Sequence, residues 1–294
     1  MKPTIGILGA GTMGTGIAEL AAAQGHPVRQ FDIKGIGRRE DLFDCAFIFE
    51  AIAEDLQEKK KALAGLPGIL ATNTSSLSVT AIADGCERVI AAHFFNPPTK
   101  MRLVEIIPGE KTSEETVQRT RALVESWGKT TVLAKDTPGF IVNRVARPFY
   151  GEALRILDEG LADIATIDWA MREFGGFRLG PFQLMDLIGN DVNLKVTEAI
   201  ALYKPAETQR RLVEAGRLGR KTGQGFYDYG KNAVMPEPNQ DRELGKAIFT
   251  RIMTKIVHQA RDLVSRGVAT AEDVDLAMKL GANYPKGPFE YDRG

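Results

Sequence analysis

The feature that most constrains the fold is a short apolar run followed by a glycine-rich turn at the start of the chain. Thr4–Leu8 predicts a buried strand, and Gly9–Gly14 then has the spacing GxGxxG. A helical pattern follows as far as Gln24, and Gly25 is a typical stop for a helix. Pro27–Asp32 predicts a second strand. This order predicts a βαβ unit of the dinucleotide-binding kind.

Each glycine of the turn has a physical task in such a unit. Gly9 permits the tight turn, Gly11 lets the backbone approach a pyrophosphate, and Gly14 lets the helix pack close to the strand. The first backbone N–H groups of the helix, at Thr12 and Met13, would face the phosphates together with the helix dipole. The turn is therefore predicted to bind a dinucleotide.

Asp32 ends the second strand, eighteen residues after Gly14, and this context makes a purely structural glycine turn the weaker interpretation. Its carboxylate would accept hydrogen bonds from the ribose hydroxyls and would repel a 2′-phosphate. NAD is therefore favoured over NADP. Lys34 lies close enough to leave NADP open as a second cofactor.

The chain between Asp32 and the next buried-strand candidate, Phe47–Ala51, is short. It has room only for a minimal strand near Ile36 and a helical turn near Leu42–Asp44. The elements expected after it are a helix from Glu54 to about Ala64, a strand over Gly68–Asn73, a helix capped within Thr74–Ser78 and ending at Ala83, a strand over Arg88–Ala92, a helix over Thr112–Trp127 and a strand over Thr131–Ala134.

Ligands bind beyond the carboxyl ends of the strands in open α/β sheets, and four polar or glycine positions fall at such ends: Gly9, Asp32, Ser75 and His93. His93 is one of three histidines, and Glu105 follows it by twelve residues in the apolar run Leu103–Ile107. Histidine is the usual side chain for moving a proton near neutral pH. His93 with Glu105 therefore predicts a site of proton transfer, against the alternative of a satisfied core histidine. Ser75 by itself is equally well explained as a helix N-cap.

The second half of the chain is helical in pattern. Asp136–Gly139 marks a boundary, and apolar residues recur at helical spacing from Phe140 onward. The sequence predicts an α/β Rossmann-type domain over residues 1–135 and an all-α domain over residues 136–294. Gly160–Phe182 returns as Gly267–Phe289 at a constant offset of 107 residues, which indicates an internal repeat. The first copy is expected over about 136–230 and a partial second copy over about 240–294.

Composition narrows the class of protein further. Lys and Arg together number 38, as do Asp and Glu, so nothing indicates a general nucleic-acid or membrane partner. No apolar run approaches membrane-spanning length, and the N-terminus does not read as a signal peptide. Cys45 and Cys86 have no metal-ligand spacing, so no metal site is predicted. A reducing, cytoplasmic setting is expected.

Several motifs together resemble those of the bacterial L-3-hydroxyacyl-CoA dehydrogenases, also called 3-hydroxybutyryl-CoA dehydrogenases, and in particular the forms with a repeated C-terminal domain. They occur in the family's order over nearly the whole chain: Gly9–Gly14, Glu50–Glu54, Asn73–Leu77, His93–Pro97, Asp136–Arg144 and Gly219–Tyr227. The last of these is a basic turn that could touch a ligand's phosphates or could be purely structural.

The resemblance implies roles by position. His93 is similar to the family's catalytic base and Glu105 to its partner. Ser75 and Asn143 are similar to the residues that hold the 3-oxygen of the substrate. Further positions of the same kind are Glu54, Lys59 and Asn73 near the cofactor, Lys59 also near coenzyme A, and Asn96 in the catalytic cluster on the substrate side.

The chain departs from the family between Asp32 and Phe47, where the family carries a long helical hairpin that helps to cover the CoA portion. The resemblance predicts NAD-dependent oxidation of an (S)-3-hydroxyacyl-CoA to the 3-ketoacyl-CoA, as in fatty-acid β-oxidation. The missing hairpin keeps open a dehydrogenase of a free 3-hydroxy acid or sugar acid, and a non-catalytic NAD-binding protein is a third alternative. A homodimer is expected, because an apolar helical face can be buried by a like unit.

Overall fold

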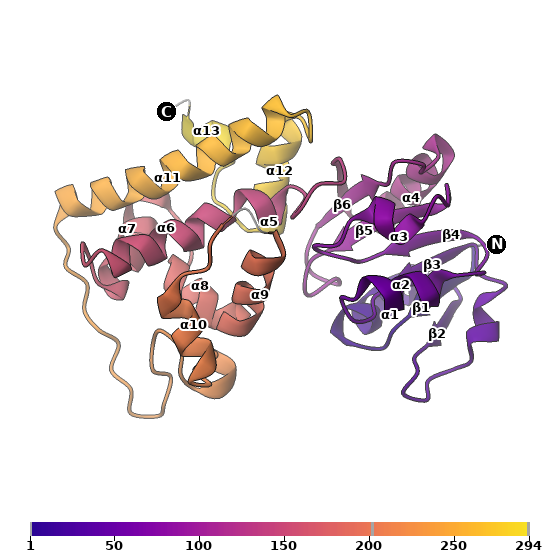
Figure 1. The fold of residues 1–294 in the computed structure, drawn as a ribbon, viewed down its shortest axis with the longest axis horizontal. Helices are drawn as coiled ribbons and strands as arrows, with labels where there is room; N and C mark the ends of the chain where they lie inside the picture. The colour runs from indigo at the N-terminus through magenta and orange to yellow at the C-terminus, as the bar shows by residue number, and fades with distance from the viewer. Residues whose placement is uncertain (1, 201–202, 293–294) are drawn as a thin grey trace. The chain divides into compact units, whose positions relative to one another are not determined.

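The computed structural model describes residues 2–200 and 203–292 and divides the chain into two compact units (Figure 1). The first unit comprises Met1–Ile141 and Gly267–Gly281, and the second comprises Val142–Arg266 and Ala282–Gly294. The first unit thus recruits a stretch from near the end of the chain. The division between residues 135 and 136 drawn from the sequence stays a prediction.

The first unit contains a seven-stranded sheet in the described part of the chain, with the order β2-β1-β3-β4-β5-β6-β7. The first five strands in this order are parallel, β6 is antiparallel to β5, and β7 is parallel to β6. The bounds are Ile5–Leu8 (β1), Val28–Phe31 (β2), Phe47–Glu50 (β3), Ile69–Thr72 (β4), Val89–Phe94 (β5), Leu103–Pro108 (β6) and Thr130–Leu133 (β7). The predicted Rossmann-type architecture is therefore confirmed.

Helices cover both faces of this sheet, because the central strands are apolar on both sides. One core cluster includes Ile7, Ile17 and Trp127, and the other includes Leu8, Leu63 and Ile82. The helices of the unit are α1 (Thr12–Ala23), α2 (Leu56–Leu63), α3 (Val79–Ala83), α4 (Glu114–Ser126) and α12 (Ala271–Gly281). Parallel strands packed in this way bring their carboxyl ends to one edge of the sheet.

The connection between β2 and β3 is as short as the sequence predicted. The expected strand near Ile36 is only a single antiparallel bridge from Ile36 to Asp32. The helical turn is the 3₁₀ helix η1 (Arg39–Leu42), which begins earlier than expected. Gly37 closes the turn with a positive φ, and a Cβ at this position would lie 2.1 Å from the carbonyl oxygen of Gln30. A close approach of two backbone segments therefore replaces a helical insertion at this place.

The second unit is helical, as predicted. α11 packs along α6, α7 and α13 (Figure 1). The bounds of its helices are Val142–Val145 (α5), Arg147–Asp158 (α6), Ile164–Gly175 (α7), Pro181–Ile188 (α8), Asn190–Ile200 (α9), Glu207–Glu214 (α10), Arg220–Thr222 (η2, a 3₁₀ turn), Arg242–Ser265 (α11) and Pro288–Asp292 (α13).

Helix bounds recur at the offset that the sequence repeat has. α6 and α11 end 107 residues apart, at Asp158 and Ser265, and α8 and α13 begin 107 residues apart, at Pro181 and Pro288. The intervening helices α7 and α12 begin with the same spacing. These bounds are compatible with a duplicated helical unit, which stays a prediction.

Two buried aspartates hold the loop that follows α10. The Asp186 carboxylate accepts hydrogen bonds from the N–H groups of Phe226 and Tyr227, both at 2.9 Å. The Asp168 carboxylate accepts from the Tyr227 hydroxyl at 2.9 Å and from the Phe182 N–H at 2.9 Å. Because these loop donors are already bound to carboxylates, the structural interpretation of the basic turn is favoured over a phosphate cradle.

We expect the free energy of unfolding to fall as the pH rises from about 4 to above 7, in part because of Asp168. Burial raises the pKa of Asp168 to about 7, against the opposing hydrogen bonds. A carboxyl group with a raised pKa in the folded state stabilises the fold while it is protonated, and this contribution is lost as the pH passes 7. Urea unfolding at pH 5 and pH 8 should show a difference smaller by roughly 1–3 kcal/mol in Asp168→Asn. Equal pH dependence of the two proteins would contradict this assignment.

Candidate active site

The glycine turn leaves an open space at the N-terminus of α1. Gly9 has a positive φ, and a Cβ at Gly14 would lie 2.2 Å from the Gly9 carbonyl oxygen, so both positions are closed to larger residues. At Gly11 a Cβ would meet nothing within 4 Å. α1 begins at Thr12 without a side-chain cap, so its first N–H groups are available to a ligand. This arrangement fits a pyrophosphate against the helix N-terminus.

Asp32 lies beside this turn because β2 is paired with β1 in parallel. Its carboxylate accepts hydrogen bonds from the N–H of Lys34 at 2.8 Å and from the N–H of Ala10 at 2.7 Å. These two bonds lower the pKa of Asp32, so that the group is an anion at neutral pH. A fixed anion next to the glycine turn fits the ribose hydroxyls of a dinucleotide and opposes a 2′-phosphate.

His93 and Glu105 face each other on neighbouring strands. They are direct partners in the antiparallel register of β5 and β6, and His93 Nδ1 lies 2.6 Å from Glu105 Oε2. His93 is 5% exposed and Glu105 is fully buried. The carboxylate requires the proton of the imidazole on Nδ1, which leaves a lone pair on Nε2. Among residues 2–200 and 203–292, none forms a hydrogen bond with Nε2 of His93. The ring is therefore set up to accept a proton there.

The far side of the pair is fixed by the segment that ends the first unit. Glu105 Oε1 accepts a hydrogen bond from the Ile141 N–H at 3.1 Å. The preceding residue, Phe140, has a left-handed backbone with φ of 46°, and its ring lies edge-on to His93 at 5.8 Å between centroids. Phe95 packs on the imidazole at 4.6 Å. The two aromatic rings hold the imidazole plane while the backbone amide holds the carboxylate.

The loop that carries Ser75 is organised by Glu54. Glu54 Oε1 accepts from the N–H groups of Ser75 and Ser76 at 3.0 and 3.1 Å, and from the Thr74 hydroxyl at 2.6 Å. Burial alone would raise the pKa of Glu54, but these hydrogen bonds and the charge of Lys59 outweigh it and lower the pKa. An ionised Glu54 therefore fixes the backbone of the loop, and the Ser75 side chain is half-buried at the carboxyl end of β4.

Lys59 is 1% exposed, and its Nζ lies 2.7 Å from Glu50 and 3.3 Å from Glu54. The structure thus places the Lys59 ammonium inside the first unit between two carboxylates. The N-cap of α3 is Ser78, whose hydroxyl accepts from the Ala81 N–H, so Ser75 does not cap this helix.

The three predicted asparagines have different surroundings. Asn73 Oδ1 accepts a hydrogen bond from the Phe94 N–H at 2.9 Å and so joins the ends of β4 and β5 next to His93. Asn96 is exposed in the loop after β5. Asn143 is half-buried in α5 and belongs to the second unit. The structure therefore gathers Ser75, His93 and the glycine turn at one sheet edge, and it describes Asn143 separately.

Two residues of the site region were missed from the sequence. Glu50 is fully buried and binds Lys59, the Thr72 hydroxyl at 2.6 Å and the Ile52 N–H at 2.8 Å. The signal for it was a carboxylate at the end of an otherwise apolar strand. Asp136 binds the start of α3 through the Val79 and Thr80 N–H groups and the Ser78 hydroxyl. No local pattern predicts that partner, because it lies 56 to 58 residues away in the sequence.

Two absences in the described part of the chain are relevant to the site. No helix in residues 2–200 and 203–292 has the length and apolar character to span a membrane. No group of three metal-ligating side chains that could hold a metal ion occurs within the same ranges.

Comparison with known protein families gives matches over both parts of the chain. The 3-hydroxyacyl-CoA dehydrogenase NAD-binding domain matches residues 4–40 and 33–137. The C-terminal domain of 3-hydroxyacyl-CoA dehydrogenase matches residues 139–229 and 248–292. The two N-terminal matches meet in the short connection between β2 and β3.

Individual proteins are similar over almost the whole chain. A 3-hydroxyadipyl-CoA dehydrogenase of Escherichia coli (strain K12) is 33% identical, covering 98% of this chain and 90% of that protein. A 3-hydroxybutyryl-CoA dehydrogenase structure from Escherichia coli K12 superimposes with a TM-score of 0.86 at 30% identity, covering 100% of this chain and 92% of the other. The fatty acid oxidation complex subunit alpha of Psychrobacter cryohalolentis is 32% identical over 97% of this chain, which spans about half the length of that relative.

Proposed function

The chain belongs to the 3-hydroxyacyl-CoA dehydrogenase family of NAD-dependent oxidoreductases, and we propose that it oxidises an (S)-3-hydroxyacyl-CoA with His93 as the base. The observation that supports His93 most directly is its 2.6 Å contact with buried Glu105, which leaves Nε2 as a proton acceptor. The pair lies at the same edge of the sheet as the glycine turn and Asp32. These are the parts that an alcohol dehydrogenase requires: a base, its orienting carboxylate and a dinucleotide site.

When bound, NAD would supply the hydride acceptor, and it would be held by the α1 N-terminus, the open space at Gly11 and the Asp32 carboxylate. Nε2 of His93 takes the proton of the 3-hydroxyl group as the alcohol becomes a ketone. Glu105 keeps the other imidazole proton on Nδ1 and stabilises the imidazolium by its charge. The aromatic rings of Phe95 and Phe140 limit rotation of the imidazole.

The remaining predicted residues have supporting parts in this proposal. Ser75 and Asn143 would donate hydrogen bonds to the 3-oxygen, on the family resemblance. Glu54 would act by holding the backbone of the Ser75 loop, and Lys59 by holding Glu54 in its ionised form. Asn73 would act through the end of β5, where it binds the N–H after His93. These are positioning roles within the first unit, with the exception of the roles of Ser75 and Asn143.

The acyl portion is proposed from the names of the relatives, which act on 3-hydroxyadipyl-CoA and 3-hydroxybutyryl-CoA. A short acyl chain of this kind is therefore the proposed substrate class. How the chain holds coenzyme A without the helical hairpin is a matter for its own residues. The homodimer, the cytoplasmic location and the role in fatty-acid β-oxidation stay predictions.

The proposed function predicts a specific pattern in an NADH absorbance assay. (S)-3-hydroxybutyryl-CoA should be oxidised with NAD, and NADP at equal concentration should support a kcat/KM lower by about tenfold or more, because Asp32 opposes the 2′-phosphate. Free 3-hydroxybutyrate should give a much lower rate than the thioester. A faster rate with the free acid would overturn the CoA assignment in favour of a free-acid dehydrogenase, and NAD binding without turnover of any hydroxyacyl-CoA would favour a non-catalytic protein.

A further inference from the structure

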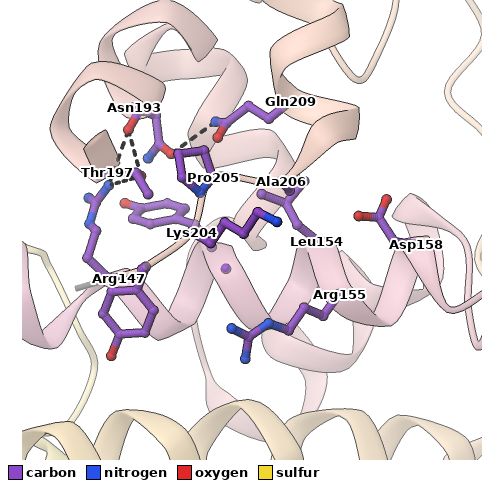
Figure 2. A pocket seen from close by; sticks show the side chains of 13 residues that line it. Arg147, Leu154, Arg155, Asp158, Asn193, Thr197, Lys204, Pro205, Ala206 and Gln209 are labelled. Atoms are coloured by element: carbon purple, nitrogen blue, oxygen red, sulfur yellow. Dashed lines mark hydrogen bonds between the residues drawn. The ribbon is translucent and has the colours of Figure 1, made fainter. Parts of the chain in front are cut away.

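A cavity of about 230 Å³ lies in the helical unit, between one face of α6 and the segment that leads from α9 to α10 (Figure 2). The α6 residues that line it are four, seven or eleven positions apart, which is the spacing of one helix face. Arg147 stands at the start of this face and Asp158 at its end, with Leu154 between them. Every lining residue belongs to the second unit.

Arg147 carries a buried charge without a carboxylate partner. It is 5% exposed, and its Nε and Nη1 groups donate to the backbone oxygen of Asn143 at 3.0 Å, to the Thr197 hydroxyl at 3.2 Å and to the backbone oxygen of Asn193 at 3.4 Å. These acceptors are all neutral. Within residues 2–200 and 203–292, no carboxylate lies within 4.0 Å of the guanidinium and no group accepts from Nη2. Ala201 and Leu202, the two remaining residues nearby in the sequence, are uncharged.

The neighbouring arginine shows how the chain treats a buried guanidinium elsewhere. Arg144 is also 5% exposed, and it pairs with Asp262 at 2.6 Å. Burial lowers the pKa of Arg147, because its charge has been removed from water without a compensating anion. A buried charge of this kind is costly unless a partner is supplied. A bound anion would supply that partner.

The remaining polar groups of the cavity favour an anion as well. Lys204 and Arg155 line it together with Arg147, and Asp158 is the only acidic lining residue among the described ones. Asp158 is engaged by the Thr208 hydroxyl. The side-chain amide nitrogen of Asn193 is buried without a hydrogen-bond partner among the described residues. A cavity of about 230 Å³ is smaller than the pockets that enclose whole drug-sized ligands, so it suits a terminal acidic group.

We propose that this cavity binds the terminal carboxylate of a dicarboxylic 3-hydroxyacyl-CoA, with Arg147 and Lys204 as its cationic partners. The inference rests on the proposed function, in which Asn143 holds the 3-oxygen. Arg147 follows Asn143 by one helical turn and donates to its backbone oxygen. Four residues of helix rise by about 6 Å, which is comparable with the reach from the 3-oxygen to the far carboxylate of a six-carbon chain. A guanidinium is well suited to bind a carboxylate through two parallel hydrogen bonds.

The test compares Lys204→Gln with wild type on two CoA thioesters of equal length, 3-hydroxyadipyl-CoA and 3-hydroxyhexanoyl-CoA. Lys204 is exposed, so its loss leaves the core intact. The ratio of kcat/KM for the dicarboxylic over the monocarboxylic substrate should fall about tenfold, mainly through KM, because one charge-assisted contact is lost. Lys195→Gln is the matched control, since Lys195 is an exposed lysine of α9 that does not line the cavity. An unchanged ratio in Lys204→Gln would overturn the proposal.

A second comparison separates the carboxylate from the other acidic groups of the substrate, the phosphates of coenzyme A. If Lys204→Gln slows both CoA thioesters equally but leaves 3-hydroxyhexanoyl-pantetheine unaffected, the anion is a phosphate and the carboxylate assignment is overturned. If wild type turns over no thioester, the proposed function itself fails. The cavity is then tested by calorimetric titration with adipate, where weaker binding by Lys204→Gln and Arg147→Lys supports an anion site and equal binding overturns it.

Discussion

Replacement of His93 by glutamine is expected to lower kcat by about 10²- to 10⁴-fold, the usual contribution of a positioned acid–base group. Glutamine can still donate a hydrogen bond to Glu105, but it cannot accept the hydroxyl proton that Nε2 accepts in the wild type. The measurement is steady-state NADH formation from (S)-3-hydroxybutyryl-CoA. The affinity for NADH, followed by its fluorescence, should remain close to that of wild type, because His93 does not belong to the glycine turn.

The control for this substitution is His258→Gln. His258 is exposed on α11, so the same chemical change is made at a position without buried partners. We expect its kcat to stay within about twofold of wild type, the scale of ordinary surface substitutions. A near-wild-type kcat in His93→Gln, with a folded protein and normal NADH binding, would end the assignment of His93 as the base.

The second large effect is expected at the glycine turn, where two glycines should respond differently to alanine. In Gly11→Ala the added methyl group meets no protein atom within 4 Å, so the fold should keep its melting temperature. The same methyl group would occupy the space predicted for the pyrophosphate. Loss of the charged hydrogen bonds made there should raise the Kd for NADH about 100-fold, equivalent to about 3 kcal/mol.

Gly14→Ala is the contrasting variant. Its methyl group would lie 2.2 Å from the Gly9 carbonyl oxygen, so α1 must move away from β1 and the protein should lose stability by several kcal/mol, of the order seen for overpacking and strain. Thermal unfolding with NADH titration measures both effects in both variants. An NADH affinity in Gly11→Ala equal to that of wild type would show that the cofactor does not approach this residue.

The features that could be predicted from the sequence are those encoded by local pattern. The glycine turn, Asp32 and the apolar runs of the sheet each depend on residues within one βαβ unit. Placement of His93 at a strand end and of Glu105 on the next strand was possible for the same reason. Their direct opposition was not predictable, because it depends on the antiparallel register of β5 and β6 across the loop between them.

The features that could not be predicted depend on partners far apart in sequence. Asp136 binds the start of α3, and Arg147 lies against α9, although neither contact leaves a periodic signal in the chain. Lys59 was expected near the ligand, whereas its ammonium lies between Glu50 and Glu54. A lysine on a short amphipathic helix is ordinarily solvated, and only the acidic residue at the end of a buried strand explains its burial.

Phe140 has one more consequence for how this protein divides its stability between folding and chemistry. Most chains place glycine where the backbone is left-handed, because a side chain there costs of order 1–3 kcal/mol. Here the position is filled by an aromatic residue whose ring faces His93 and whose next amide holds Glu105. The protein thus accepts a less stable backbone at the point where the imidazole must stay still. Thermostabilisation by glycine at this position would therefore trade rigidity of the base for conformational ease.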